Sequence, residues 1–242
     1  MNLPGLSATA RTLASFVAAA VVTATTLSPV AAAAPAAGDT YVYRLSNGYN
    51  REVRGQIQYR IDKIDADRIT VAVTTDTPSL GAARTEVYAK DGNGLRHPLV
   101  NHDFLRDYEF APAYPAYVFP LDPGKSWSVR VTAVDPATGR RNSVRVDGEV
   151  LGSERITVPA GAFDTIKVRR YVYAGDWEGF RHETNITEID WYAPVLGRPV
   201  RTESKSEYLD TSRATGGGIL GGPIIHGDWT VLELAAASTA KP

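Results

Sequence analysis

Few residues in this chain could carry chemistry, and its four histidines are the first to consider. His97 and His102 lie close together in a proline-rich segment, with Asp107 and Glu109 shortly after them. Imidazole and carboxylate groups can hold a divalent cation, so a mononuclear metal site is one hypothesis. However, the spacing matches no standard ligand motif, such as two histidines four residues apart on a helix. We therefore interpret the histidines as scattered surface residues and predict no bound metal and no cofactor.

The sequence also gives little support for an enzyme. The chain has no cysteine, which excludes a thiolate nucleophile, thiolate metal sites and lipid attachment at an N-terminal cysteine. No Gly-x-Ser-x-Gly motif occurs, so the nucleophile elbow of the α/β-hydrolases is missing. Paired carboxylates of the glycosidase type are recognised by their separation in space, which a sequence does not give. We find no catalytic constellation and predict that the protein is not an enzyme.

The aromatic residues are more informative, because most of them fall in segments that alternate like β-strands. If the sheet they lie on closes tightly, they form an ordinary core, which is the usual place of an aromatic side chain. If the sheet stays open, they line an apolar groove that carries phenol and indole groups, a common composition of ligand pockets. The candidate residues for this ligand groove are Trp127, Trp191, Tyr192, Tyr171 and Tyr173.

Alternation with a period of two residues predicts β-hairpins that bury one face. Apolar residues alternate with polar ones over 57–61 and again over 69–73, on either side of the short turn Asp65–Asp67. A second hairpin is predicted from 127–131 and 144–146 around a turn that contains Asp135 and Gly139. Further strands are expected at Tyr41–Leu45, Glu86–Lys90, Val150–Val158, Thr165–Tyr173, Thr187–Tyr192, Val200–Glu207 and Trp229–Leu234.

No segment holds a long helical repeat, which fixes the expected fold class. One or two helical turns are possible over His102–Phe110, and the prolines from Pro112 onwards prevent a longer helix. We predict an all-β protein with a curved antiparallel sheet, either an open half-barrel or a barrel.

The stretch Ile156–Arg170 (ITVPAGAFDTIKVRR) interrupts a strand pattern and restarts it. Pro159 supplies a fixed φ and Gly161 a permissive one, as a tight turn requires. We predict a structural turn between two strands, with Phe163 as a core residue over the hairpin. The glycine-rich segment 214–223 lacks the Lys-Ser or Lys-Thr of a phosphate-binding loop, so we interpret it as a linker.

Three phrases resemble a broad family of bacterial secreted β-rich proteins that are classed as domains of unknown function. They are FPLDPGKSW at 119–127, VPAGAFD at 158–164 and WYAPVLG at 191–197. The resemblance covers about residues 117–202, and Ala162 stands where threonine is usual. It implies a strongly curved antiparallel sheet, similar to the half-barrels of the LolA/LolB lipoprotein carriers. It implies no catalytic residues, because the shared phrases are turns and core aromatics.

The N-terminus resembles a secretory signal peptide. Arg11 precedes an apolar, alanine-rich run, and Ala34-Pro35-Ala36 offers a cleavage site. We expect a signal peptide over 1–36, a β-rich domain over 37–213, a linker over 214–223, and a terminal strand and tail over 224–242. The mature protein is then soluble, with no membrane span, in the periplasm or outside the cell.

Two hypotheses about function remain. The net charge of −1 gives no electrostatic reason to expect nucleic acid as a partner. The first hypothesis is a periplasmic binding or carrier module for an apolar small molecule, a lipid or an extended peptide. The second is a structural or interaction domain of the cell envelope, whose packed core leaves no room for a ligand and whose surface meets an envelope protein.

Overall fold

The computed structural model describes residues 35–77, 81, 83–99, 107–175, 181–212 and 222–239. Within these residues the chain forms twelve strands and one short 3₁₀ helix, η2. The elements are β1 (Thr40–Asn47), β2 (Val53–Ile64), β3 (Arg68–Thr75), β4 (Ala83–Ala89), β5 (Gly94–Pro98), β6 (Asp107–Tyr114), β7 (Ser126–Val134), β8 (Arg141–Val158), β9 (Gly161–Gly175), β10 (Arg181–Ala193), η2 (Pro194–Leu196), β11 (Arg198–Asp210) and β12 (Ile224–Ser238).

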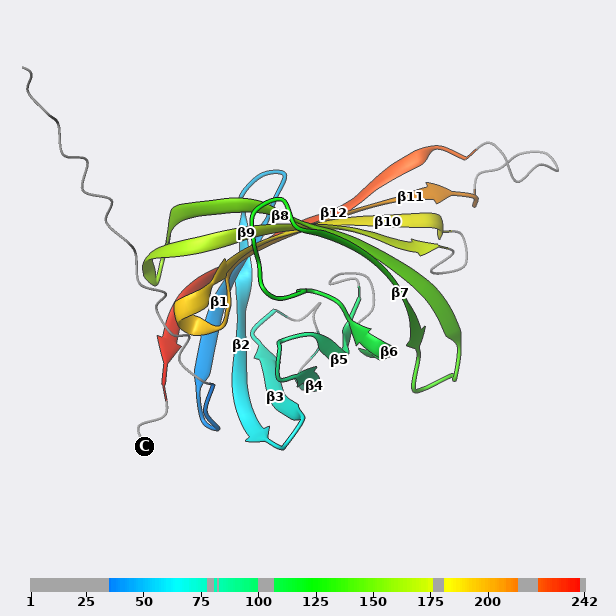
Figure 1. The fold of residues 1–242 in the computed structure, drawn as a ribbon. Coiled ribbons are helices and arrows are strands. Elements are labelled where there is room, and N and C mark those ends of the chain that lie inside the picture. Colours follow the sequence, from blue (N-terminus) through cyan, green and yellow to red (C-terminus); the bar gives the residue numbers. More distant parts are fainter. Residues whose placement is uncertain are drawn as a thin grey trace, which may run out of the picture.

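The strands form one closed antiparallel barrel. Each strand pairs with its neighbours in the chain, and β1 pairs with β12 to close the ring. Figure 1 shows the long strands β7 to β12 arching over the shorter strands β3 to β6. Closure leaves no free sheet edge among these strands, which protects the backbone donors and acceptors. The predicted all-β fold is confirmed, in its barrel form.

Both predicted hairpins are confirmed, and their registers place the apolar residues on the inside. In the first, Ile61 of β2 lies opposite Val71 of β3. In the second, Val131 of β7 lies opposite Val144 of β8. All four side chains are at least 95% buried. Since strand side chains alternate between the two faces, the polar residues between them face outwards.

The predicted turn in the ITVPAGAFD phrase is also confirmed. Strand β8 ends at Val158 and β9 begins at Gly161, whose φ of +130° lies in the region that favours glycine. The tip of this hairpin lies against β12, because the backbone N–H of Ala160 donates a hydrogen bond to the carbonyl of Leu234 at 3.0 Å. Phe163 is partly buried against the cluster of core residues that contains Leu234. The phrase therefore acts structurally.

One local expectation differs from the structure. Residues 107–110, which the sequence allows as a helical turn, belong to β6, while 100–106 lie outside the described residues. Tyr108, Phe110 and Tyr114 of β6 are each at most 5% exposed. Burying these three aromatic side chains from an extended segment favours the strand over an isolated helical turn.

Two expected boundary segments fall mostly outside the described residues. These are the signal peptide, of which 1–34 are not described, and the glycine-rich linker, of which 214–221 are not described. The segment expected as a separate terminal strand is β12, which pairs with both β11 and β1. Across the part of the chain that the structure describes, no helix has the length and apolar character needed to cross a membrane.

Candidate ligand cavity

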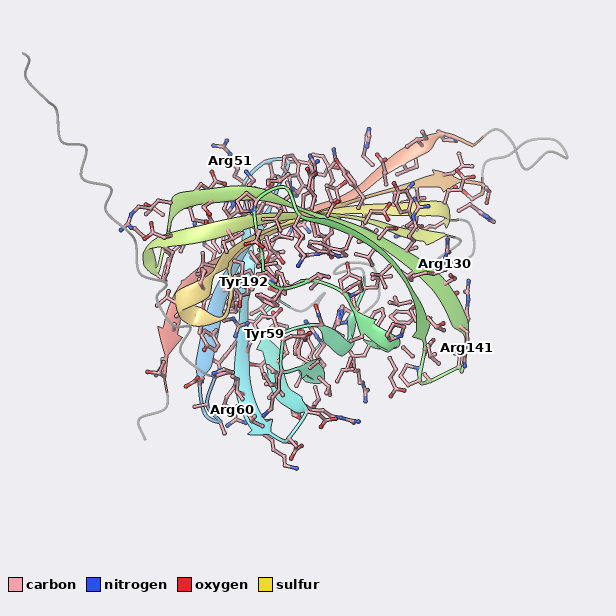
Figure 2. All side chains as sticks on the ribbon, viewed as in Figure 1. Arg51, Tyr59, Arg60, Arg130, Arg141 and Tyr192 are labelled. Atoms are coloured by element: carbon pink, nitrogen blue, oxygen red, sulfur yellow. The ribbon has the colours of Figure 1, made fainter. Side chains whose placement is uncertain are left out.

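A cavity of about 450 Å³ lies inside the barrel. Its wall is formed by β1 to β6 on one side and by β9 to β12 on the other. In Figure 2 the labelled side chains of Tyr59 and Tyr192 lie towards the inside of the barrel, whereas Arg60, Arg130 and Arg141 lie at its periphery. Tyr59 and Tyr192 both line the cavity.

One end of the cavity opens to solvent. Pro35, Lys90, Asp91 and Phe119 all line the cavity and are all exposed. These residues lie outside the strands, in the segment before β1, in the β4–β5 turn and in the connection between β6 and β7. A ligand could therefore enter between loops without separating any pair of strands.

The wall is largely aliphatic and aromatic on the side of β1 to β3. Ile61, Ile69 and Val71 line the cavity there, together with Tyr41 and Tyr59. Burial raises the pKa of Tyr59 far above its ordinary value, so its phenol keeps its proton at neutral pH. This side of the cavity suits a hydrocarbon surface that meets a few hydroxyl groups.

An ion cluster centred on Arg170 of β9 forms the opposite wall. The Arg170 side chain is 4% exposed, and its Nε and Nη2 donate to Glu188 Oε2 at 2.9 Å and Asp190 Oδ2 at 2.8 Å. Its Nη1 donates to the carbonyl oxygen of Ala116 at 3.2 Å. The hydroxyls of Tyr114 and Tyr117 donate to the same two carboxylates, each at 2.7 Å.

These contacts leave little unused hydrogen-bonding capacity in the cluster. Every nitrogen of the Arg170 guanidinium donates, and Asp190 Oδ1 accepts a further bond from Thr202 at 2.8 Å. Burial raises the pKa of Tyr114 and Tyr117 well above the ordinary value, which keeps both phenols available as donors. We interpret the cluster as a rigid, internally satisfied part of the wall.

A third carboxylate of the cavity wall, Glu86 of β4, is paired with an arginine in the same way. It is 2% exposed, and Arg84 Nε donates to its Oε1 at 2.7 Å. The Tyr88 hydroxyl donates to its other oxygen. Burial raises the pKa of Tyr88 well above its ordinary value, with a further contribution from the Glu86 carboxylate. Glu86 therefore presents a paired charge to the cavity.

His97 lies in the cavity wall among aromatic rings, so the interpretation of this histidine as a surface residue is wrong. Its ring stacks on Phe110 at 4.6 Å and lies 6.1 Å from the parallel ring of Tyr88, and its Nδ1 is 2.7 Å from the carbonyl oxygen of Pro98. Burial lowers the pKa of His97, which favours the neutral ring. Among the described residues, no group of three or more His, Asp or Glu side chains could hold a metal ion.

Of the five groove candidates, Tyr192 lies in the cavity wall and Trp127 lies just behind it. The Tyr192 ring is 4.9 Å from the ring of Tyr117, and both rings face the cavity. Trp127 packs in the same apolar cluster, and its Nε1 donates to the carbonyl oxygen of Pro115 at 3.1 Å. A Cβ atom added at Gly148 would lie 2.1 Å from the Trp127 ring, so the ring needs a glycine opposite it.

The other three candidates do not line the cavity. Tyr171 and Tyr173 are 42% and 40% exposed, with Arg169 and Arg145 over their rings. Trp191 is only 8% exposed, and Lys167 Nζ lies 4.7 Å from its ring centre. Its neighbours Asp190 and Tyr192 line the cavity, and Trp191 is the residue between them.

Sequence reasoning missed the charged residues of the wall, although a signal for them was present. In β9, Val168, Arg170 and Val172 share a face by strict alternation, and all three are buried. An arginine flanked at both second neighbours by valine is therefore an inward-facing arginine in a sided strand. The same alternation places Tyr171 and Tyr173 on the outer face.

Comparison with known proteins supports the fold and leaves the family open. No family model matches the chain, and no curated protein matches it, so the resemblance of the three phrases stays a prediction. Among solved structures, the fold is similar to that of a "putative lipoprotein" from Parabacteroides distasonis, with a TM-score of 0.51, 14% identity, and coverage of 84% of this chain and 97% of that one.

Two other solved structures are similar at lower scores. One is a "putative exported protein with YmcC-like fold" from Bacteroides fragilis, with a TM-score of 0.48, 15% identity, and coverage of 85% of this chain and 97% of that one. The other is the "hypothetical lipoprotein YmcC" from Escherichia coli, with a TM-score of 0.41, 12% identity, and coverage of 84% and 85%. At these identities the likeness concerns the fold alone.

Proposed function

We propose that the protein is an exported binding or carrier module that holds an apolar or amphipathic molecule inside its barrel. The observation that carries this proposal is the cavity of about 450 Å³. Protein interiors are normally packed so closely that voids larger than a water molecule are few. Ligand pockets, in contrast, span roughly 300–1,000 Å³ and are lined mainly by apolar and aromatic side chains with a few placed polar groups.

The shape of the site favours a small molecule or lipid over an extended peptide. A peptide that adds a strand needs a free sheet edge, and the described strands form a closed ring. The exposed residues Lys90, Asp91 and Phe119 line the same cavity as the aliphatic residues of β2 and β3. A molecule with a hydrocarbon part would thus bury that part without breaking any strand pairing.

Export is proposed from the sequence. The apolar run after Arg11 and the Ala34-Pro35-Ala36 site have the layout of a signal peptide. The names of the structurally similar proteins describe them as lipoprotein or exported proteins. We expect the intact mass of the exported protein to show a mature start near Ala37, whereas full-length protein in the membrane fraction would argue for a retained anchor.

Binding can be tested with the neutral fluorescent probe N-phenyl-1-naphthylamine. The folded protein should bind this probe saturably, at one molecule per chain. The variant Val71→Phe replaces a small side chain at the cavity wall by a bulky aromatic ring and should weaken binding, whereas Thr70→Phe on the opposite face of β3 should leave it unchanged. Melting temperatures of both variants show whether each is folded.

The alternative is a structural or protein-interaction domain whose barrel interior serves stability alone. In that case the probe would show no saturable binding to the wild-type protein. Val71→Phe would then change the melting temperature without changing the fluorescence of the added probe. This pair of results would overturn the carrier proposal.

A further inference from the structure

Arg198, the first residue of β11, lies in the cavity wall within a cage of tyrosine rings. Its guanidinium carbon is 3.9 Å from the ring centre of Tyr41, 5.4 Å from that of Tyr43 and 5.5 Å from that of Tyr59. All three tyrosines also line the cavity. A guanidinium stacked on an aromatic ring keeps its N–H groups free at its edge, where they can meet a planar acid.

Among the described residues, the hydrogen-bond partners of Arg198 are tyrosine hydroxyls. Its Nε donates to the Tyr43 hydroxyl at 2.9 Å, and that hydroxyl in turn donates to the carbonyl oxygen of Pro199 at 2.6 Å. The Tyr41 hydroxyl can engage at most one of the two terminal nitrogens. At least one terminal nitrogen, with two N–H donors, is therefore available.

Arg198 also forms no ion pair with any described carboxylate, which separates it from the other buried charges of the wall. Arg170 is held by Glu188 and Asp190, and Glu86 by Arg84. The Arg170 cluster has one carboxylate more than it has cations, but those carboxylates already accept bonds from Arg170 and from hydroxyl groups. Arginine stays charged at any ordinary pH.

A charge that is withdrawn from bulk water and left without a counter-charge is costly, and it is usually compensated by an opposite charge. Arginine is especially suited to this, because its planar fork binds carboxylate and phosphate groups through two parallel hydrogen bonds. Beside Arg198 and its tyrosine cage lies the aliphatic wall formed by Ile61, Ile69 and Val71.

We propose that Arg198 binds the acidic head group of an amphipathic anion whose hydrocarbon tail lies along Ile61, Ile69 and Val71. This inference rests on the proposed function and narrows it to molecules such as fatty acids or alkyl phosphates. The shared chemistry is one carboxylate or phosphate on an aliphatic chain. The hydroxyl of Tyr41, which also lines the cavity, offers a further donor.

The test compares three competitors that share one tail. Decanoate, decyl phosphate and 1-decanol are each titrated against N-phenyl-1-naphthylamine bound to the folded protein. We expect at least one of the two anions to displace the probe at a concentration about tenfold or more below that of 1-decanol, since a hydrogen bond to a charged group exceeds a neutral one. The anion that does so identifies the head group as carboxylate or phosphate.

The variant Arg198→Gln should abolish this preference for an anion while keeping the binding of the neutral probe. Arg155→Gln is the matched control, because Arg155 has a 64% exposed side chain on β8 and does not line the cavity; it should keep the preference. If Arg198→Gln fails to fold, the competitors are compared on the wild-type protein alone: equal displacement overturns the role of Arg198, and a preference for an anion supports it.

Equal displacement by decanoate, decyl phosphate and 1-decanol would overturn the role of Arg198 and leave the carrier proposal standing. An anion preference that persists in a folded Arg198→Gln variant would also overturn it. No saturable binding of the neutral probe at all would instead overturn the proposed function. Binding of the neutral probe thus tests the proposed function, and the preference for an anion over 1-decanol tests the role of Arg198.

Discussion

Replacing Arg170 with methionine should destabilise the barrel strongly, because Arg170 neutralises two carboxylates inside it. The Arg170 side chain is 4% exposed, and Glu188 and Asp190 are 15% and 5% exposed. In Arg170→Met both carboxylates keep only hydroxyl donors, from Tyr114, Tyr117 and Thr202. Removing one partner of a buried ion pair typically costs about 3–5 kcal/mol of unfolding free energy.

For a chain of this size, one kcal/mol corresponds to a shift of roughly 2–4 °C in the melting temperature, so the expected loss is about 6–20 °C. Thermal unfolding followed by circular dichroism measures it. The loss should be smaller at pH 5 than at pH 8, because a carboxylate without its counter-charge can take up a proton in acid. Arg155→Met is the control; it removes an exposed pair with Asp164 and should cost only about 0–1 kcal/mol.

A triple variant separates lost charge balance from lost packing. Adding Glu188→Gln and Asp190→Asn to Arg170→Met removes the two uncompensated charges and should recover part of the lost stability. If Arg170→Met melts within about 2 °C of the wild type, a shift no larger than that of an exposed pair, the cluster does not hold the wall. If the triple variant recovers nothing, the loss came from packing alone, and the electrostatic reasoning is refuted.

Three further predictions concern Gly148, His97 and the tip of the β8–β9 hairpin. Gly148→Ala should cost about 1–3 kcal/mol, measured by chemical denaturation, because the added Cβ would meet the Trp127 ring; an unchanged midpoint would mean that the ring can move freely. Burial lowers the pKa of His97, because the neutral ring is favoured in the folded protein. The contribution of this ring to the free energy of unfolding is therefore full above about pH 6.5 and is lost as the pH falls below that value. His97→Phe should therefore lose less unfolding free energy than the wild type between pH 7.5 and 5.5, and an equal loss would contradict this. Gly161→Val should cost roughly 1–3 kcal/mol through backbone strain at its φ of +130°, and Phe163→Ala should cost less than the roughly 3–5 kcal/mol of a fully buried phenylalanine; unchanged melting temperatures of both variants would mean that this hairpin tip is not structural.

The sheet could be predicted from the sequence because its hairpins obey a simple local rule. Where apolar residues alternate over five or more positions, as in 57–61 and 69–73, one face must be buried, and the short turn between them fixes the register. The closure of the barrel is harder to predict from the sequence, because it depends on the pairing of β1 with β12, which lie at opposite ends of the β-rich domain. No local pattern encodes that contact.

The candidate site was harder to predict, since two general tendencies pointed away from it. Aromatic residues are usually buried, which suggested Tyr171 and Tyr173, but β9 turns these outwards, beside arginines that cover their rings. Charged residues are rarely buried unless they are paired, which argued against Arg170 and Arg198. The partners of Arg170 lie on β10, at Glu188 and Asp190, and are identified only once the strands are paired.

The most direct test of the carrier proposal is a crystal structure of the protein grown with 11-bromoundecanoate, in which the anomalous signal of bromine locates the tail. We predict a bromine peak inside the barrel, next to the aliphatic wall of β2 and β3, with the carboxylate at Arg198. A cavity that contains only water, with bromine peaks confined to the outer surface, would contradict the proposal that this barrel carries an amphipathic ligand.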